Sequence, residues 1–593
     1  MKKGLWIPLL MLSGFALIHS SAEAPRIAVP LSFDYYYTYD MMAAALRALH
    51  QAYPKLTLLE EVGKSEEGRP IYCLTVNNPR TGSAREKPGI YVDGNIHGNE
   101  IQAGEVALYL LNYLLTEYGR NPEITQLVDR CCFYVVPVVN VDGRFHFFAD
   151  ANSSNNNRSL RIPRDDDRDG RFDEDSADDL DGDGNICQMR RRDPFGRFKT
   201  CPDDPRLLVR CKPGEKGEWK ILGEEGIDND NDGRVNEDSE GYVDGNRNWG
   251  FDWMPPYVQS GAGDYPFQAV GLKALAEFIS RRPNICVGWV FHNFGGMYLR
   301  GPSVKTQEGE YPRADVAVYD YLGEQAERIT PGYRYLIGWK DLYPTYGDCE
   351  QWLAMTQGAY MFTGELFIEK QEQFQSIKES QKEGLAQKPR GEDEVNDFFG
   401  DPALEIERLR FSDHLTQGEL YKPWKPYKHP QYGDIEIGGW VKMSTRLPAP
   451  FMLKDLVHRN AMVIIFSAKQ TPDVSLEVID KRQVAPGLLQ LRIRLINSTA
   501  IPTMSYHAQK VKLYPQDTLT VSGSAISVRA GGQVIDPDLN EVAYKEHRPE
   551  IQFLTVPGFG KVEYQFLISG SGLLVLTYAS RHAGKIVKTI TLD

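Results

Sequence analysis

Apolar strand-like runs alternate with helical segments between residues 69 and 369, and this alternation restricts the fold more than any other feature. The runs are rich in β-branched and aromatic residues and lie at 69–76, 89–94, 131–140, 286–293 and 359–369. Helical spacing of apolar residues marks 35–59, 101–118 and 271–279. Because alternating strands and helices build a sheet covered on both faces, we expect an α/β domain with a mixed sheet.

The pattern changes near residue 472, where short alternating segments such as LLQLRIRLIN and KVEYQFLIS begin. Such segments, separated by Gly, Asn and Pro, are typical of an all-β sandwich. With 593 residues the chain is long enough for several cores. The expected parts are a signal peptide at 1–24, the α/β domain at 25–430 with an insertion at about 160–240, a linker at 431–471, and a β-sandwich accessory domain at 472–593. A Lys-, Glu- and Gln-rich stretch at 369–396 is expected to be solvent-exposed.

The first 24 residues have the pattern of a cleavable signal peptide. Two lysines precede an apolar run from Leu5 to Ile18, and Ala22-Glu23-Ala24 offers a cleavage site. The alternative, a membrane anchor, is disfavoured because the run is short, and no later run is long enough to span a bilayer. We therefore expect a periplasmic or secreted protein without stable membrane insertion.

Eight cysteines, all between Cys73 and Cys349, would suit an oxidising compartment. The even count permits up to four disulfides, and Cys201 with Cys211 could close a local loop. Cys73 and Cys286 lie in strand-like runs, where small buried hydrophobic residues are an equal interpretation.

Negative charge is concentrated in one region. The formal net charge is -14, and residues 165–240 hold 24 acidic and 13 basic residues, so a local excess of 11 accounts for most of it. An acidic chain without a basic stripe is a poor nucleic-acid binder. Crowded carboxylates repel one another unless a cation binds between them, so this region requires cations.

Two segments in this region repeat one template. DDDRDGRFDED at 165–175 and DNDNDGRVNED at 228–238 place Asp, Gly, an apolar residue and Glu at the same offsets, and DLDGDGNI at 179–186 shares the first part. Alternate carboxylates converge on one hard cation, but the twelfth-position Glu of an EF-hand is missing. We expect structural calcium loops of another kind, with a disordered acidic linker as the alternative. The expected calcium ligands are Asp165, Asp167, Asp169, Glu174, Asp179, Asp181, Asp183, Asp228, Asp230, Asp232 and Glu237.

A candidate transition-metal site begins at GNIHGNE, residues 94–100. His97 and Glu100 stand between a strand-like run and a helical segment, at the kind of strand end where α/β sheets place their sites. A second HxxE match, at His547, lies in the all-β region with no helix after it. A catalytic zinc of the His2Glu type needs a third ligand and keeps one position open. His292 ends another strand-like run and is the expected third ligand, although alone it would more often be a core histidine.

On these residues the chain resembles the M14 family of zinc carboxypeptidases, roughly over residues 30–430. Beyond the HxxE turn, four segments match in order: NVDGR at 140–144, VDGNRNWG at 243–250, HNFGGMYL at 292–299 and FTGEL at 362–366. The resemblance implies that Glu365 is the general base that takes a proton from the attacking water. Zinc lowers the pKa of a bound water to about 7, so hydrolysis near neutral pH is expected. The alternative for Glu365 is an inward-facing carboxylate paired with an arginine.

The resemblance also implies substrate contacts. Asn246 and Arg247 match the pair that grips the substrate's free C-terminal carboxylate, for which arginine offers a two-point fork. Counting back from Glu365 places Tyr343 on the tyrosine that closes over bound substrate. The same count places Glu350 at the side-chain specificity position, where an acid would favour a terminal Lys or Arg; a surface glutamate is the alternative.

The oxyanion arginine of the family usually precedes the Asn-Arg pair, in an interval that the acidic insertion enlarges here. Arg190 is the expected residue, with Arg191 and Arg192 as alternatives. The family's NPDG reads NVDG in this chain. Because the insertion lies near the expected cleft, it leaves the size of the substrate open.

These observations favour an exported zinc metallocarboxypeptidase that acts on peptide or protein C-termini. Cleavage of peptidoglycan stem peptides is an alternative that the gripping residues also permit. A non-catalytic, calcium-stabilised binding protein is the alternative from another class. It is disfavoured because a binding protein has no need of Glu365.

Overall fold

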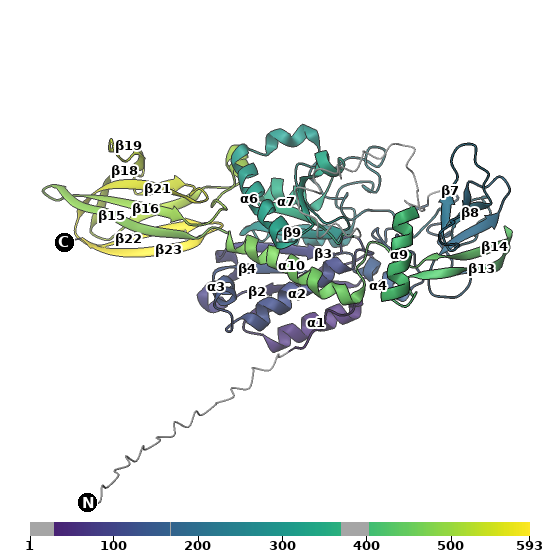
Figure 1. Ribbon diagram of the computed structural model, residues 1–593. Helices are drawn as coiled ribbons and strands as arrows, with labels where there is room; N and C mark the ends of the chain where they lie inside the picture. Colours follow the sequence, from purple (N-terminus) through teal and green to yellow (C-terminus); the bar gives the residue numbers. More distant parts are fainter. Residues whose placement is uncertain (1–28, 166–167, 369–401, 593) are drawn as a thin grey trace, which may run out of the picture.

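The structure is a computed structural model that describes residues 29–165, 168–368 and 402–592. The expected signal peptide, Asp167 of the first acidic loop and the stretch 369–396 lie outside these residues. In Figure 1 an α/β part stands between two β-rich parts, one at each end of the molecule.

The α/β part is built on an eight-stranded mixed sheet, as the alternating pattern predicts. The strand order is β1-β2-β4-β3-β9-β12-β10-β11, and β4, β3, β9 and β12 run parallel to one another. The strands are β1 (Thr57–Lys64), β2 (Pro70–Val76), β3 (Gly89–Gly94), β4 (Cys132–Val136), β9 (Ile285–Asn293), β10 (Met297–Arg300), β11 (Arg334–Ile337) and β12 (Tyr360–Leu366).

Strand β9 is buried along its whole length because both faces of the sheet are covered. Its side chains alternate between the faces. Trp289 stacks on Phe362 of β12 at 4.6 Å between ring centroids and donates a hydrogen bond to Ser467 of a covering helix. His292, three residues after Trp289, therefore belongs to the opposite face.

Helices cover both faces of the sheet. The predicted helices at 101–118 and 271–279 are confirmed as α2 and α5, whereas the segment 35–59 forms only a short helix, α1, because Pro54 cannot continue it. The helices of this part are α1 (Tyr39–Ala52), α2 (Gln102–Glu117), α3 (Pro122–Arg130), α4 (Val141–Ala149), α5 (Val270–Ser280), α6 (Arg313–Ile329), α7 (Cys349–Gln357) and α10 (Pro450–Lys469).

The segment 431–471 is not a linker, contrary to the expectation. Residues Gly433–Trp440 form strand β14, whose Ile435 and Ile437 are buried. Residues Pro450–Lys469 form α10, which packs on α2 and β9 of the α/β core. The segment was misread because its apolar residues belong to two different cores.

The second β-rich part combines strands of the insertion with residues that follow the stretch 369–401, which lies outside the described residues. Its six antiparallel strands have the order β13-β14-β5-β8-β6-β7, and α9 (Pro402–Leu415) lies beside them (Figure 1). The strands are β5 (Gln188–Arg192), β6 (Phe198–Thr200), β7 (Leu208–Arg210), β8 (Trp219–Glu224), β13 (Tyr421–His429) and β14.

The C-terminal part consists of two antiparallel β-sheets that share one core, as predicted. A short helix, α11 (Tyr506–Val511), joins it to the α/β part, because the buried Asp315 of α6 accepts hydrogen bonds from the Tyr506 and His507 amides. The strands are β15 (Val474–Ala485), β16 (Leu488–Asn497), β17 (Asp517–Ser522), β18 (Ile526–Asp536), β19 (Glu541–Tyr544), β20 (Ile551–Leu554), β21 (Gly560–Gly570), β22 (Gly572–Ser580) and β23 (Gly584–Leu592).

The eight cysteines all fall within described residues, and none is paired, so the proposed Cys201–Cys211 bridge is not present. Seven of them are buried, as expected of small hydrophobic residues. No described helix is both long and apolar enough to cross a bilayer.

Candidate active site

The register of the parallel strands brings the HxxE turn next to His292. Gly94, the last residue of β3, pairs with Phe291 of β9. The turn that follows β3 therefore starts beside the end of β9 and carries His97 and Glu100 over His292. All three side chains are at most 2% exposed.

The turn is shaped by short-range contacts. Asn95 adopts a left-handed φ of 58° and donates hydrogen bonds from Nδ2 to the carbonyls of His97 (2.6 Å) and Gly98 (3.0 Å). A Cβ at Gly98 would lie 2.2 Å from the carbonyl oxygen of Asn157, so only glycine fits there.

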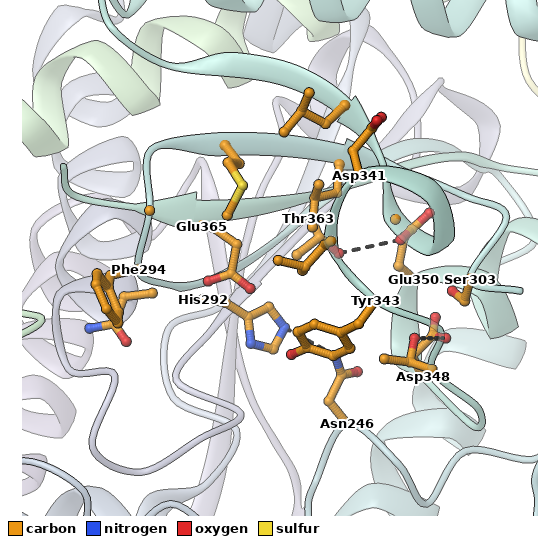
Figure 2. Close-up of a pocket in the computed structure, with 18 of the residues that line it drawn as sticks. Asn246, His292, Phe294, Ser303, Asp341, Tyr343, Asp348, Glu350, Thr363 and Glu365 are labelled. Carbon is orange, nitrogen blue, oxygen red and sulfur yellow. Dashed lines mark hydrogen bonds between the residues drawn. The ribbon is translucent and has the colours of Figure 1, made fainter. Parts of the chain in front are cut away.

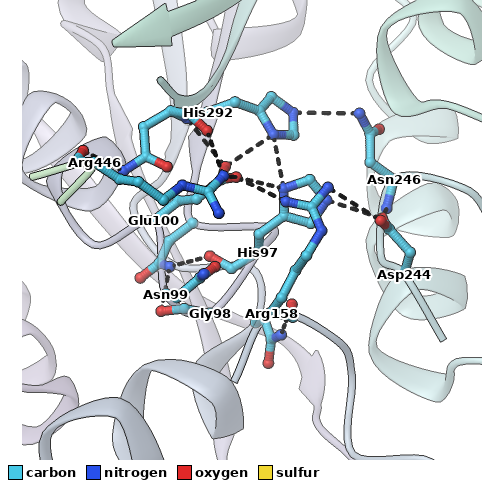
Figure 3. Close-up of polar contacts among 12 residues, drawn as sticks. His97, Gly98, Asn99, Glu100, Arg158, Asp244, Asn246, His292 and Arg446 are labelled. Carbon is cyan, nitrogen blue, oxygen red and sulfur yellow. Dashed lines mark hydrogen bonds and ion pairs between the residues drawn. The ribbon is translucent and has the colours of Figure 1, made fainter. Parts of the chain in front are cut away.

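Three ligand groups converge on one point (Figure 3). His97 Nδ1 lies 3.0 Å from Glu100 Oε1, and His292 Nδ1 lies 3.1 Å from both His97 Nδ1 and Glu100 Oε2. The other ring nitrogen of His97, Nε2, lies 2.9 Å from Asp244 Oδ1. A hydrogen bond from Nε2 to Asp244 leaves the Nδ1 lone pair directed at the shared point, the usual arrangement for a metal-binding histidine.

Charge around this point also favours a cation. Burial alone would raise the pKa of Glu100, but His97 and His292 outweigh it and hold the pKa well below its usual range. Burial alone would also raise the pKa of Asp244, but His97 and Arg158 outweigh it and hold this pKa well below its usual range. Two imidazoles and an ionised carboxylate fit zinc of the His2Glu type.

A buried ion pair holds the turn from behind. Arg144 Nη2 lies 2.6 Å from Glu105 Oε1, and both side chains are fully buried. Arg144 Nη1 donates to Asn95 Oδ1 and to the Ile101 carbonyl, each at 2.8 Å, so it bridges the two ends of the turn. Its Nε and Nη2 also reach the Tyr37 carbonyl, which ties the N-terminal segment to the same pair.

Glu365 stands beside the ligands in a cleft of about 760 Å³ (Figure 2). It pairs in register with His292 of β9 and with Met297 of β10, and it lies on the same face of the sheet as His292. Burial raises the pKa of Glu365 to about 7; His292 and Arg158 oppose the shift, and Glu100 contributes to it. A carboxylate with such a pKa is suited to exchange protons near neutral pH.

Asn246 and Arg247 line the same cleft. Figure 3 shows Asn246 on the side of His292 away from Glu100. The Cys349 amide donates to Asn246 Oδ1 at 2.9 Å, which fixes the side-chain amide, and Nδ2 lies 3.3 Å from His292 Nε2. Arg247 Nη1 is held by the Asn246 carbonyl at 2.7 Å. Both residues are largely buried, so they are preorganised rather than flexible.

The family comparison agrees with this geometry over part of the chain. Residues 42–196, which include His97 and Glu100, match the model of the zinc carboxypeptidase family, peptidase M14. Residues 473–591 match a domain of unknown function, DUF8731, which is the C-terminal β part.

Named relatives resemble short stretches of the chain. Carboxypeptidase D of Mus musculus is 38% identical over 133 residues, which are 22% of this chain and 9% of that protein. Carboxypeptidase B of Astacus astacus is 35% identical over 115 residues, 19% of this chain and 36% of that protein. The matched stretch thus covers well under two thirds of the length of these relatives. The solved structure of bovine thrombin-activatable fibrinolysis inhibitor in complex with tick carboxypeptidase inhibitor aligns with 73% of this chain and 97% of that chain at 15% identity. The TM-score of this alignment is 0.39.

Tyr343 and Glu350 line the same cleft as Glu365. Tyr343 is 49% exposed at the cleft mouth. Glu350 is buried, accepts a hydrogen bond from the Gly301 amide at 2.8 Å, and shares its pocket with Asp341 and Asp348 (Figure 2). Burial, with the nearby Asp348, raises the pKa of Glu350 well above its usual range.

Arg190 does not line this cleft. It belongs to β5 of the six-stranded sheet, where it pairs with Glu436 at 2.6 Å between the rings of Trp219 and Trp424. Arg158 lines the cleft and contacts Glu100 Oε1 at 3.0 Å and Asp244 Oδ2 at 3.2 Å.

Arg191 and Arg192 follow Arg190 on β5, and none of the three lines the cleft. Arg158 was missed because the insertion was assumed to displace the arginine, whereas this residue precedes it. Asp244 was also missed, although its place two residues before the Asn-Arg pair could have indicated it.

The described residues of the three acidic loops in the insertion share one hydrogen bond. In each loop the first aspartate accepts a hydrogen bond from the amide of the glycine five residues later, as Asp165, Asp179 and Asp228 do. Asp175 and Asp238 form an antiparallel bridge that places the first and third loops side by side. Carboxylates gather in four groups: Asp169, Glu174 and Asp230; Asp175, Asp230 and Glu237; Asp179, Asp181 and Asp183; and Asp228, Asp230 and Asp232.

Replacing Asp244 with alanine is predicted to weaken zinc binding about tenfold to a hundredfold, because His97 loses the acceptor that orients its ring. Competition with a chromophoric chelator measures this affinity. The control is Asp264→Ala, an exposed aspartate on the neighbouring loop, which should bind zinc as the unaltered protein does. Unchanged zinc affinity in Asp244→Ala would contradict the assignment of His97 Nδ1 as a ligand.

Proposed function

We propose that the protein is an exported zinc metallocarboxypeptidase that hydrolyses the C-terminal peptide bond of peptides or proteins. The observation that carries this proposal is one cleft lined by the His97–Glu100–His292 group, by Glu365 and by the Asn246–Arg247 pair. Figure 2 shows His292 between Glu365 and Asn246. A base beside the metal ligands favours hydrolysis. The fixed Asn246–Arg247 pair, which could bind the C-terminal carboxylate of a substrate, favours cleavage at a chain end.

Each side chain has a role that its position supports. His97, Glu100 and His292 would hold zinc, which polarises the scissile carbonyl and activates water. Glu365 takes a proton from the attacking water and returns it to the leaving amine. Arg158 stabilises the negative charge that develops on the carbonyl oxygen, because it is already held at the site by Glu100 and Asp244.

Export is part of this proposal. It is supported by the lysines, apolar run and cleavage pattern of residues 1–24.

Substitution of the proposed base tests the reaction. Glu365→Gln is predicted to lower kcat by at least about a hundredfold on blocked dipeptides, because the amide cannot accept the proton. A chelator should abolish turnover by the unaltered protein, and added zinc should restore it. Glu324→Gln, on the exposed side of α6, is the matched control. An active Glu365→Gln protein would refute the assigned base, and chelator-resistant release of the final residue would refute the zinc mechanism.

We further propose that the pocket around Glu350 selects a basic C-terminal residue. Asp341, Asp348 and Glu350 place three carboxyl groups on its wall. A Lys or Arg side chain entering this pocket would find an opposite charge in a low-dielectric site, where ion pairing is strong.

This specificity is predicted to depend on pH. Because the pKa of Glu350 is raised, its ionised form increases with pH, and the preference for a terminal Lys over a terminal Met should increase between about pH 6 and pH 9. The ratio of the two kcat/KM values measures the preference and cancels pH effects common to both substrates. Glu350→Gln should give a low ratio that hardly changes with pH. A ratio that falls with pH in the unaltered protein would contradict this role.

We propose in addition that calcium stabilises the acidic insertion and has no part in catalysis. Three of the four carboxylate groups share Asp230, and burial together with neighbouring acids raises the pKa of Glu174 and of Glu237 to about 7. A bound divalent cation would relieve this repulsion.

Calcium is predicted to raise the melting temperature, since a ligand that binds only the folded state stabilises it by about 2.7 kcal/mol at 100 times its Kd. Sodium chloride of equal ionic strength should not reproduce the effect. Asp230→Asn should remove most of the calcium-induced increase, while the exposed control Asp203→Asn should keep it. Equal melting temperatures with calcium and with sodium chloride would rule out these sites.

A further inference from the structure

Helix α7 reaches the cleft with its first turn. The Cys349 amide donates to Asn246 Oδ1 at 2.9 Å, and Glu350, the next residue of the helix, lines the cleft (Figure 2). The position of α7 therefore fixes both the Asn246 side chain and one wall of the pocket around Glu350. The metal ligands and Glu365 belong to the turn after β3, to β9 and to β12, and not to α7.

The last turn of α7 is held by the C-terminal β part. His507 of α11 is 8% exposed, and its Nε2 lies 3.2 Å from the carbonyl oxygen of Met355 in α7. Its Nδ1 lies 3.2 Å from the Glu310 carbonyl oxygen. Carbonyl oxygens only accept hydrogen bonds, so the imidazole must be the donor in these contacts. Because the last carbonyls of a helix have no partner within the helix, His507 caps α7 from another part of the chain.

Close packing leaves little room for α7 to shift against α11. Gly358, which ends α7 with a left-handed φ of 71°, faces α11. A Cβ at Gly358 would lie 3.0 Å from Ala508 Cβ and 3.2 Å from Ser505 Oγ. Helix α11 is itself fixed, because the buried Asp315 of α6 accepts hydrogen bonds from its first two amides at 2.9 Å and 2.7 Å. The end of α7 is therefore held in one position.

A displacement at one end of α7 is carried to the other end. Met355 and Cys349 are six positions apart in the helix, a rise of about 9 Å. All residues from Cys349 to Met355 are buried, so no exposed turn between them can absorb the movement. Rigid elements of this kind transmit energetic coupling between separate sites.

We propose that the C-terminal β part sets the substrate affinity of the cleft through α7, with His507 as the positioning residue. This proposal rests on the proposed carboxypeptidase function. The contact of His507 with α7 keeps the Cys349 amide on Asn246 and keeps Glu350 on the pocket wall, so it acts on binding of the substrate's C-terminal residue. The domain of unknown function at 473–591 thereby gains a role in substrate binding by the α/β part.

Substitution of His507 tests the contact. His507→Leu removes the donors and keeps a side chain of similar size, and it is predicted to raise KM about threefold to tenfold for a blocked dipeptide ending in Lys. The value of kcat should be unchanged, since the metal ligands and Glu365 lie outside α7. The preference for a terminal Lys over a terminal Met should fall, because Glu350 belongs to the same helix. His507→Gln keeps an amide donor and should recover most of the affinity.

His582 offers a matched control at the same interface. It is 1% exposed in the C-terminal β part, and its Nε2 lies 3.3 Å from the carbonyl oxygen of Pro283, in the segment before β9 rather than in α7. His582→Leu should lower the melting temperature as His507→Leu does, but it should leave KM and the Lys preference unchanged. Equal increases in KM for the two variants would reflect a general loss of stability and would overturn the role of His507.

A second measurement needs no variant of His507, because coupling between two sites is reciprocal. In the Glu365→Gln background, binding of a peptide ending in Lys should slow hydrogen exchange of the α11 amides. Calorimetry on the same sample shows that the peptide is bound. Bound peptide with unchanged exchange in α11 would overturn the proposal, whether or not His507→Leu folds.

The kinetic results also distinguish this proposal from the function on which it rests. Unchanged KM and an unchanged Lys-to-Met ratio in folded His507→Leu, with the final residue still released, would overturn the role of His507 and leave the carboxypeptidase function standing. Failure of the unaltered protein to release the final residue from any peptide would overturn both.

Discussion

Parallel pairing of β3, β9 and β12 is the constraint on which the site depends. It places the carboxyl ends of three strands at one edge of the sheet, so that the turn after β3, the last residues of β9 and the end of β12 meet. Since side chains alternate along a strand, the same register that directs Trp289 into the core directs His292 and Glu365 into the cleft. A shift by one residue would separate the base from the ligands.

The buried charges near this edge support one another. Arg144 and Glu105 are fully buried together, and an ion pair in such a place is strongly destabilised when one partner is removed. The ion pair fixes the geometry of the site, because Arg144 bridges both ends of the turn that carries His97 and Glu100. Asp244 extends the same arrangement by orienting His97 and holding Arg158.

The sequence predicted the α/β sheet, the C-terminal β-sheets and the grouping of His97, Glu100 and His292, because apolar runs and strand ends are local signals. It failed where a residue acts through distant partners. Arg190 was chosen by its place in the chain, but two tryptophans and Glu436 hold it in another sheet. Arg446, which lines the cleft, could not have been placed there from the sequence, since its position depends on β14 and α10 belonging to two different cores.

The cleft that results is lined by the ligand group, by the acids Asp341, Asp348 and Glu350, and by several arginines. All of this depends on one metal held by two imidazoles and a carboxylate. X-ray absorption at the zinc edge of the purified protein tests that claim most directly. The account predicts one zinc per chain with nitrogen and oxygen neighbours at about 2.0–2.2 Å, lost in His292→Ala. Sulfur neighbours at about 2.3 Å, or a zinc signal unchanged in His292→Ala, would contradict it.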